Sequence, residues 1–200
     1  MVRIINVEVA IATLDGGGVV ALPTDTVYGL AAEIGHPTAV ETIFTLKDRP
    51  RTRALPVLVD SVGQIGYLGA VWNEKAQKLA DAYWPGALTI VVAVPHELAT
   101  LLGSEIDTAG FRIPDDDVVR RMIAVIGPLA VSSANVHGAS ACHSAYEVRD
   151  MFESKSDLVG VVDGGERSGD VSTVVDVTGE SWTILREGAT PTSAIATLLA

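Results

Sequence analysis

The sequence predicts an α/β or α+β domain built on a twisted mixed β-sheet that helices flank. Short apolar runs typical of buried strands recur along the chain, and segments with helical spacing separate most of them. Strict alternation fails near the C-terminus, where two strand-like runs follow each other directly. The 200 residues fit one domain, residues 1–200, because no repeat, low-complexity tract or linker divides them.

The first quarter of the chain predicts a helix, a strand and a second helix. Residues 7–14 end at three glycines, which suits a helix closed by glycine. Residues 18–21 predict a buried strand, and residues 22–30 follow as a polar turn that a proline makes rigid. Residues 37–47 predict a helix with proline at its first position. Polar side chains at the end of a strand suggest a site, although a hydrogen-bonded turn without a ligand is the alternative.

The next segment predicts a loop, two strands and a helix. Residues 48–53 are a loop because Pro50 disfavours helix before it and charges cluster there. Residues 55–59 predict a strand at an edge or a strand start, since their proline cannot donate to a ladder. Residues 73–83 have helical spacing, and residues 87–94 have the strongest character of a central strand.

The third segment again leads a strand into polar residues. Residues 109–114 predict a short strand, and residues 115–117 are acidic and start a helix that runs to about residue 126. Carboxylates favour the positive end of the helix dipole, so we interpret this acidic run as a cap. Residues 128–131 predict a buried strand that ends in the polar loop 132–135.

The last segment predicts two helices, a strand and a hairpin. Residues 144–153 are expected to be helical and residues 158–163 to form a strand, followed by the glycine-rich loop 164–170. Two strands within residues 172–185 bracket a polar turn and predict a hairpin. Residues 191–199 predict the final helix.

Composition indicates a well-folded chain of the reducing cytoplasm. Its hydrophobic fraction is 48%, and the one cysteine cannot form an intrachain disulfide. We expect no membrane partner, because no apolar stretch approaches the length of a span and no signal peptide is recognisable. The net charge of −11 disfavours strong direct binding of nucleic acid, but a small anion such as a nucleotide needs only a few local cations.

Several familiar site motifs are absent. The chain has no Walker loop, no glycine fingerprint after a strand and no nucleophile elbow. The four histidines are scattered, and His137, Cys142 and His143 fit no standard zinc spacing. We therefore predict no metal site made by the chain alone.

Polar clusters that follow predicted strands or helices are the remaining candidates. Two cations in a proline-stiffened loop, Lys47 and Arg49, could approach a polyphosphate from one side, although solvated surface charges are the alternative. Ser133 and Asn135 could donate neutral hydrogen bonds, and a buried Arg112 or Arg186 would need an anionic partner. The complete set is Thr24-Asp25-Thr26, Lys47 and Arg49, Arg112, Ser133 and Asn135, Ser172-Thr173, and Arg186.

Together these clusters resemble a YrdC-type domain, of the threonylcarbamoyl-AMP synthase family in its single-domain form. The matching region runs from about residue 10 to residue 190. Its segments are Pro23-Thr24-Asp25-Thr26-Val27-Tyr28-Gly29-Leu30, Lys47-Asp48-Arg49-Pro50, Trp84-Pro85-Gly86-Ala87-Leu88-Thr89, Phe111-Arg112-Ile113-Pro114, Ser132-Ser133-Ala134-Asn135, Ser172-Thr173-Val174-Val175-Asp176 and Arg186-Glu187-Gly188. Each segment is a weak signal, but their combined order is highly specific.

The resemblance implies a ligand cleft and a nucleotidyltransferase that forms L-threonylcarbamoyladenylate and pyrophosphate from L-threonine, bicarbonate and ATP, with Mg²⁺ accompanying ATP. A downstream tRNA threonylcarbamoyl transferase would then modify the adenosine at tRNA position 37. By this resemblance the catalytic residues are Lys47 and Arg49. The ATP-binding residues are Arg49, Ser133, Asn135 and Arg186, and the threonine-binding residues are Thr24, Arg112 and Ser172.

Four positions depart from the fullest family pattern. Arg53 stands for an asparagine, Leu58 for a histidine, Ala141 for a serine and Ala54 for a proline. These departures leave two alternatives open. One is a noncatalytic nucleotide-binding or RNA-binding module of the same fold, and the other is a related paralogue that forms a different carbamoyl adenylate.

Overall fold

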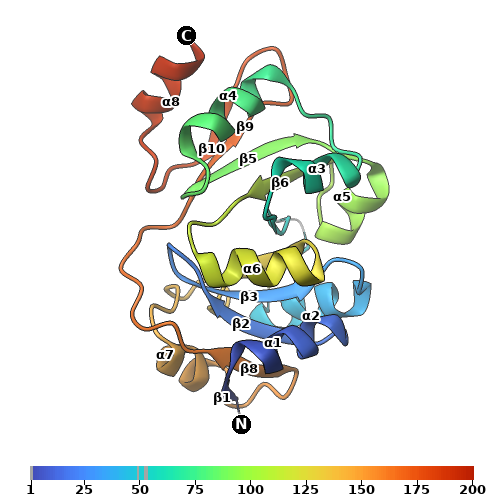
Figure 1. Cartoon of the computed structure of the whole chain (residues 1–200), viewed down its shortest axis with the longest axis vertical. Helices are drawn as coiled ribbons and strands as arrows, with labels where there is room; N and C mark the ends of the chain where they lie inside the picture. The colour runs from blue at the N-terminus through green and yellow to red at the C-terminus, as the bar shows by residue number, and fades with distance from the viewer. Residues whose placement is uncertain (1, 49, 52–53) are drawn as a thin grey trace.

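The computed structural model describes residues 2–48, 50–51 and 54–200 (Figure 1). One mixed sheet contains the strands in the order β1-β8-β2-β3-β7-β4-β6-β5-β9-β10. The strands are β1 (Arg3–Ile5), β2 (Val19–Pro23), β3 (Tyr28–Glu33), β4 (Val57–Leu58), β5 (Leu88–Ala93), β6 (Thr108–Arg112), β7 (Leu129–Ser133), β8 (Leu158–Val162), β9 (Thr173–Asp176) and β10 (Thr183–Arg186). The predicted mixed sheet is therefore confirmed.

Helices cover both faces of this sheet. They are α1 (Val7–Asp15), α2 (Pro37–Lys47), α3 (Val62–Tyr67), α4 (Glu74–Tyr83), α5 (His96–Leu102), α6 (Asp117–Ile126), α7 (Ala145–Met151) and α8 (Thr192–Leu199). Alternate side chains of β2 enter different cores, as the period of a strand requires. Val20 and Leu22 pack with α1 and α6, whereas Val19 and Ala21 pack with α2. Figure 1 shows α1 and α6 together in front of β2 and β3.

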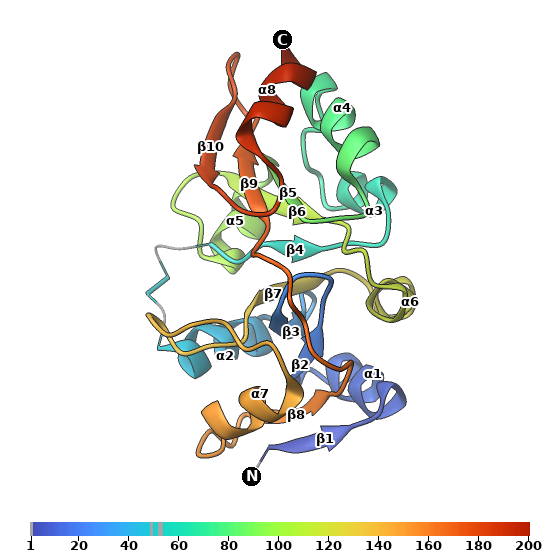
Figure 2. The same ribbon diagram turned by 90° about the vertical axis from the view of Figure 1, so that its left-hand side faces the viewer.

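The middle of the sheet is a narrow neck. β4 has only two residues, and it pairs with β7 on one side and with β6 on the other. Figure 2 shows β4 between a group formed by β1, β8, β2, β3 and β7 and a second group formed by β6, β5, β9 and β10. The expectation of an edge strand at residues 55–59 is wrong, because Pro56 precedes the ladder and its carbonyl still accepts from the Val131 N–H at 2.9 Å. The alternative of a strand start is confirmed.

Sequence patterns missed four elements, namely β1, β3, α3 and α5. The polar turn predicted for residues 22–30 is shorter than expected, because β3 begins at Tyr28 and pairs antiparallel with β2. β1 is a three-residue strand at the sheet edge beside β8, and its sequence alone is too short to signal a strand. Helices α3 and α5 span six and seven residues, which is too short for a helical period to stand out.

The other predicted elements are confirmed with small shifts of their ends. Asp116 caps α6, because its carboxylate accepts from the backbone N–H groups of Val118 and Val119. β9 and β10 form the predicted antiparallel hairpin. Among the described residues, none of the helices has the length and apolar character needed to cross a membrane.

Candidate functional site

A cavity of about 930 Å³ lies at the neck of the sheet and takes its walls from both groups of strands. Seven of the eight residues that the sequence predicts as ligands line it. They are Thr24, Lys47, Arg112, Ser133, Asn135, Ser172 and Arg186. The eighth, Arg49, lies outside the described residues. The structure thus brings together residues up to 162 positions apart in the chain, from Thr24 to Arg186.

The charge of the cavity opposes the charge of the chain. Lys47, Arg112 and Arg186 line it, whereas its described lining residues include no aspartate or glutamate. The whole chain carries −11, so the positive charge is concentrated locally. Such a pocket attracts a small anion, while the surface around it disfavours a long polyanion.

The cavity does not offer a metal site of its own. Mg²⁺ prefers carboxylate and phosphate oxygens, and the described lining contributes no carboxylate. No group of three or more histidine, cysteine, aspartate or glutamate side chains suited to a metal ion occurs within the described ranges. The described lining therefore offers Mg²⁺ no carboxylate ligand, and the prediction that Mg²⁺ accompanies ATP stays a prediction.

Lys47 is fixed at the end of α2 with its ammonium against the loop that follows β7. The side chain is buried, and Nζ donates to the carbonyl oxygens of Ser133 at 2.5 Å and Asn135 at 2.6 Å and to Asn135 Oδ1 at 3.0 Å. Asp48 adopts a left-handed conformation and ends the helix there. A buried ammonium held by several oxygens keeps one orientation, so its charge is placed accurately on the cavity wall.

Ser133 and Asn135 form a rigid polar pair at the carboxyl end of β7. Ser133 Oγ donates to Asn135 Oδ1 at 2.6 Å, and Asn135 Nδ2 donates to the carbonyls of Val136 and Ala139. The amide orientation of Asn135 is therefore set by four partners, including Lys47. These contacts join the lysine, the serine and the asparagine into one cluster, as the resemblance implied for a nucleotide site.

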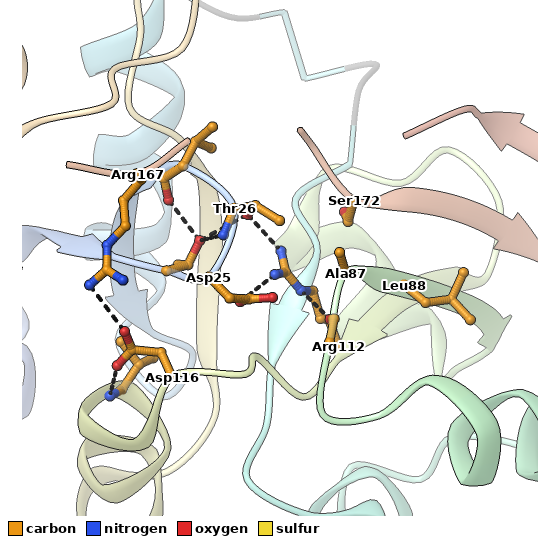
Figure 3. Close-up of polar contacts among 12 residues, drawn as sticks. Asp25, Thr26, Ala87, Leu88, Arg112, Asp116, Arg167 and Ser172 are labelled. Atoms are coloured by element: carbon orange, nitrogen blue, oxygen red, sulfur yellow. Dashed lines mark hydrogen bonds and ion pairs between the residues drawn. The ribbon is translucent and has the colours of Figure 1, made fainter. Parts of the chain in front are cut away.

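Arg112 bridges the two groups of strands across the cavity (Figure 3). It lies at the end of β6, with 6% of its surface exposed. Its Nη2 donates to Asp25 Oδ1 at 2.5 Å, and its Nη1 donates to Thr26 Oγ1 at 3.1 Å. Its Nε donates to the Gly86 carbonyl at 2.8 Å. The anionic partner that a buried Arg112 requires is therefore Asp25, for which sequence analysis proposed no separate role.

Thr24 belongs to the turn that carries Asp25. Its hydroxyl donates to the Val27 carbonyl at 2.7 Å and accepts from the Thr26 N–H at 3.3 Å. A hydroxyl has one hydrogen, so Thr26 must be the donor in the 2.9 Å contact between the two threonine oxygens. The Thr24 hydroxyl is thus saturated inside the turn, and its predicted contact with threonine stays a prediction.

Ser172 and Arg186 occupy the wall formed by β9 and β10. Arg186 donates through Nε and Nη2 to the Ser172 carbonyl, and Nη2 also donates to Ser172 Oγ at 3.0 Å. A register shift between Ile184 and Arg186 in β10 places both Leu185 and Arg186 on the cavity. Within the described part of the chain Arg186 has no carboxylate partner.

The environment of Arg186 favours an incoming anion. Burial lowers the pKa of Arg186 from its ordinary value, and the positive charge of Arg112 lowers this pKa further. Two guanidinium groups therefore repel each other across this part of the cavity. An anion bound between them would relieve that repulsion.

Residues 163–172 form a strap that leaves β8 and crosses to β9, as Figure 2 shows. Tyr28 holds its beginning, because the phenol donates to the Gly165 carbonyl at 2.8 Å and accepts from the Gly164 N–H at 3.0 Å. Burial raises the pKa of the Tyr28 phenol above its ordinary value, so the phenol remains a donor at neutral pH. Sequence analysis left Tyr28 without a role, and its partners, more than 130 positions away, gave no local signal.

We expect Tyr28→Phe to loosen the strap at a modest cost. The variant removes both hydrogen bonds, but Gly164 and Gly165 are exposed and water can replace the hydroxyl. The free energy of unfolding should fall by about 1 kcal/mol, and the melting temperature by about 2–4 °C. Thermal denaturation measures the change, with Tyr67→Phe as control because Tyr67 is 94% exposed. Equal melting temperatures for the two variants would contradict this role of Tyr28.

His137, Cys142 and His143 have separate environments. His137 lines the cavity, Cys142 is buried beside Met151, and His143 Nδ1 contacts the Arg167 carbonyl at 2.5 Å. Burial raises the pKa of the Cys142 thiol to about 11. Cys142 is therefore a core residue with a neutral thiol.

The raised pKa predicts a loss of stability at high pH. The thiol ionises near its ordinary pKa of 9.0 in the unfolded chain but only near about 11 in the folded chain. The burial of the neutral thiol contributes fully to the free energy of unfolding below pH 9. This contribution is lost as the pH rises toward 11, by up to about 2–3 kcal/mol. Denaturant titrations of wild type and Cys142→Ala at several pH values measure the difference. If the free energies of unfolding of wild type and Cys142→Ala differed by the same amount from pH 8 to 11, the pKa of Cys142 would not be raised in the folded chain.

The four departures from the family pattern fall at different places. Leu58 and Ala54 line the cavity, whereas Ala141 is absent from its lining. Arg53 lies outside the described residues. Leu58 thus presents an apolar surface where the fullest family pattern has an imidazole.

A single mixed sheet with a cationic cavity at its neck defines an α/β protein built to receive a small anionic ligand. The sequence model of the Sua5/YciO/YrdC family, described as "Telomere recombination", matches residues 12–188. The chain therefore belongs to the Sua5/YciO/YrdC family, and the resemblance to YrdC-type domains is confirmed.

Named relatives span most of this chain. The threonylcarbamoyl-AMP synthase of Pyrococcus abyssi is 34% identical over 188 residues, which cover 93% of this chain and 55% of that protein. A putative threonylcarbamoyl-AMP synthase of Mycobacterium leprae is 38% identical over 192 residues, which cover 95% of this chain and 86% of that protein. The chain thus spans about half the length of the first relative and most of the second.

Solved structures agree with the family assignment. The crystal structure of Pyrococcus abyssi Sua5 complexed with L-threonine superposes with a TM-score of 0.90 at 32% identity. The match covers 96% of this chain and 57% of that chain. The fold expected from the resemblance is therefore confirmed.

Proposed function

We propose that this chain is a threonylcarbamoyl-AMP synthase that forms L-threonylcarbamoyladenylate and pyrophosphate from L-threonine, bicarbonate and ATP. The observation that carries the proposal is the convergence of seven predicted ligand residues on one cationic cavity. The family assignment and the names of the relatives in Pyrococcus abyssi and Mycobacterium leprae support it. As a class, the protein would be a nucleotidyltransferase.

ATP would lie between the α2 and β7 side of the cavity and Arg186 of β10. In this proposal Lys47 faces the phosphates, Ser133 and Asn135 orient the nucleotide, and Arg186 approaches from β10. The family resemblance also assigns Arg49, which lies outside the described residues, to ATP. Transfer of a nucleotidyl group needs reactants in line and donors that stabilise the charge on phosphate oxygens, and it does not require a nucleophilic side chain. The fixed ammonium of Lys47 supplies positive charge to this part of the cavity, since its contacts with oxygens of Ser133 and Asn135 hold it in one orientation.

L-threonine would bind near Arg112, Ser172 and Thr24. A guanidinium is the natural partner of an amino-acid carboxylate because its N–H groups match both carboxylate oxygens. Arg112 lies at the cavity with its plane fixed by Asp25, Thr26 and Gly86. The amino group of the substrate would then face the nucleotide wall.

The chemistry balances in two steps. The threonine ammonium and bicarbonate give the N-carboxylate, one water molecule and one proton. An oxygen of this carbamate then attacks the α-phosphorus of ATP, the new P–O bond forms, and the bond from that phosphorus to the pyrophosphate oxygen breaks. Mg²⁺ bound to ATP would neutralise charge on the phosphates, and the described cavity lining adds no carboxylate ligand to it.

The product would be consumed by a second protein. Threonylcarbamoyladenylate is a mixed anhydride and transfers its acyl group readily, so a tRNA threonylcarbamoyl transferase would take it to the adenosine at position 37. The acidic surface of this chain disfavours strong direct binding of the tRNA.

Release of pyrophosphate tests the proposal. Purified chain with MgATP should release pyrophosphate only when L-threonine and bicarbonate are both present. Turnover that is unchanged when threonine is omitted would refute the proposed substrate. Tight RNA binding with a steep salt dependence and no pyrophosphate release would instead support the noncatalytic alternative.

A further inference from the structure

Asp25 and Arg112 form a pair whose side chains come from the two groups of strands and meet across the cavity (Figure 3). Asp25 belongs to the turn between β2 and β3, and Arg112 ends β6. The side chains are 15% and 7% exposed, so the pair is largely shielded from solvent. A shielded pair of opposite charges at 2.5 Å holds both groups in place more firmly than an exposed pair.

The hydrogen bonds of Arg112 leave part of its guanidinium available. An arginine has five N–H groups. Nε donates to Gly86, one N–H of Nη1 to Thr26, and one N–H of Nη2 to Asp25. One N–H remains on each terminal nitrogen, and Arg112 lines the cavity. These two N–H groups remain for further acceptors, such as an oxygen of a substrate carboxylate.

The turn itself fixes the position of Asp25. Thr26 donates to Thr24, and Thr24 donates to the Val27 carbonyl, so both hydroxyl hydrogens are committed within the turn. Thr26 Oγ1 is then left as the acceptor for Arg112. On the other side, Gly169 of the strap packs against this turn, where an added Cβ would lie 2.8 Å from the Asp25 carbonyl oxygen. The acceptors of Arg112 are thus held before any ligand arrives.

We propose that Asp25 is a positioning residue, which acts through Arg112 to hold the guanidinium ready for the carboxylate of the amino-acid substrate. This inference rests on the proposed function for the identity of that substrate. Asp25 also offsets the charge of Arg112, which lies near enough to Arg186 to act on its ionisation. Without Asp25, Arg112 would be a buried cation with only neutral acceptors, and its side chain would turn toward water.

Steady-state kinetics test this role. We expect Asp25→Ala to raise the KM for threonine by about tenfold or more, with the KM for ATP changed by less than about twofold. Asp25→Asn keeps an oxygen that can accept from Nη2 of Arg112. Its KM for threonine should therefore lie close to that of wild type and well below that of Asp25→Ala. The matched control is Asp116→Ala, which removes a similarly buried partner of another arginine, Arg167, outside the cavity lining. An equal rise of the threonine KM in this control would overturn the proposal, because it would show a general loss of structure.

A measurement without substrate separates this inference from the proposed function. The Arg112 Nε–H group, identified in NMR spectra by its absence in Arg112→Lys, should be protected from hydrogen exchange in wild type. We expect its exchange to accelerate by about tenfold or more in Asp25→Ala and to stay unchanged in Asp116→Ala. Unchanged exchange in Asp25→Ala would overturn the positioning role. If wild type releases no threonine-dependent pyrophosphate, the proposed function fails, and the exchange rates alone decide whether Asp25 positions Arg112.

Discussion

Lys47→Ala is expected to reduce threonine-dependent pyrophosphate release by about a hundredfold to a thousandfold, the loss typical when a preorganised donor to developing negative charge is removed. The ammonium contacts oxygens of both Ser133 and Asn135. Its removal takes away a positive charge from the proposed nucleotide wall and releases the loop after β7. The initial rate of pyrophosphate release at saturating ATP and threonine measures the effect.

Two further variants separate the charge of Lys47 from its packing. Lys47→Met keeps most of the buried apolar stem but removes the ammonium, and we expect a rate close to that of Lys47→Ala. Lys78→Ala removes an exposed lysine of α4 and should leave the rate unchanged. If Lys47→Met retained the wild-type rate, the charge of Lys47 would have no part in the reaction.

The sequence predicted the long elements because their patterns are local. Helix α6 is an example, since acidic residues at its start and apolar residues on one face are both visible in the sequence, and Asp116 caps it as expected. Strand β4 shows the limit of such patterns. Two residues cannot define a period, and only the pairing with β6 and β7 makes them the neck of the sheet.

Residue types and family motifs predicted which residues belong to the site. They did not predict the contacts that these residues make with one another. The motifs indicated Arg112 and Thr24 as neighbours of one substrate. They could not show that Asp25 neutralises Arg112, because those residues are 87 positions apart and pair only when the two groups of strands meet. Tyr28 was missed for the same reason, since its partners lie in the strap.

Gly188 gives a physical reason for one of the weaker motifs. Arg186-Glu187-Gly188 begins at the last residue of β10, and an added Cβ at Gly188 would collide with the carbonyl oxygen of Val171 and the backbone of Ser172. The glycine therefore lets the end of the strap approach β10 closely. This approach places Ser172 within reach of Arg186.

Arg112→Ala is expected to raise the KM for threonine by about a hundredfold, or about 2.7 kcal/mol, because charge-assisted hydrogen bonds contribute about 1.5–3 kcal/mol each. Arg112→Lys keeps the positive charge but loses the planar fork, so it should recover only a small part of that loss. Kinetics with threonine and ATP varied separately measure both constants.

Arg186→Ala supplies the reciprocal control at a second guanidinium of the same cavity. Arg112 and Arg186 both line the cavity, but Arg112 is paired with Asp25, whereas the part of the chain described here gives Arg186 only the oxygens of Ser172. If Arg186 serves the nucleotide, its removal should raise the KM for ATP by about tenfold or more and leave the KM for threonine nearly constant. Identical effects of the two variants on both constants would mean that the two guanidiniums bind one shared anion, and the proposed division of the cavity into a threonine side and an ATP side would be wrong.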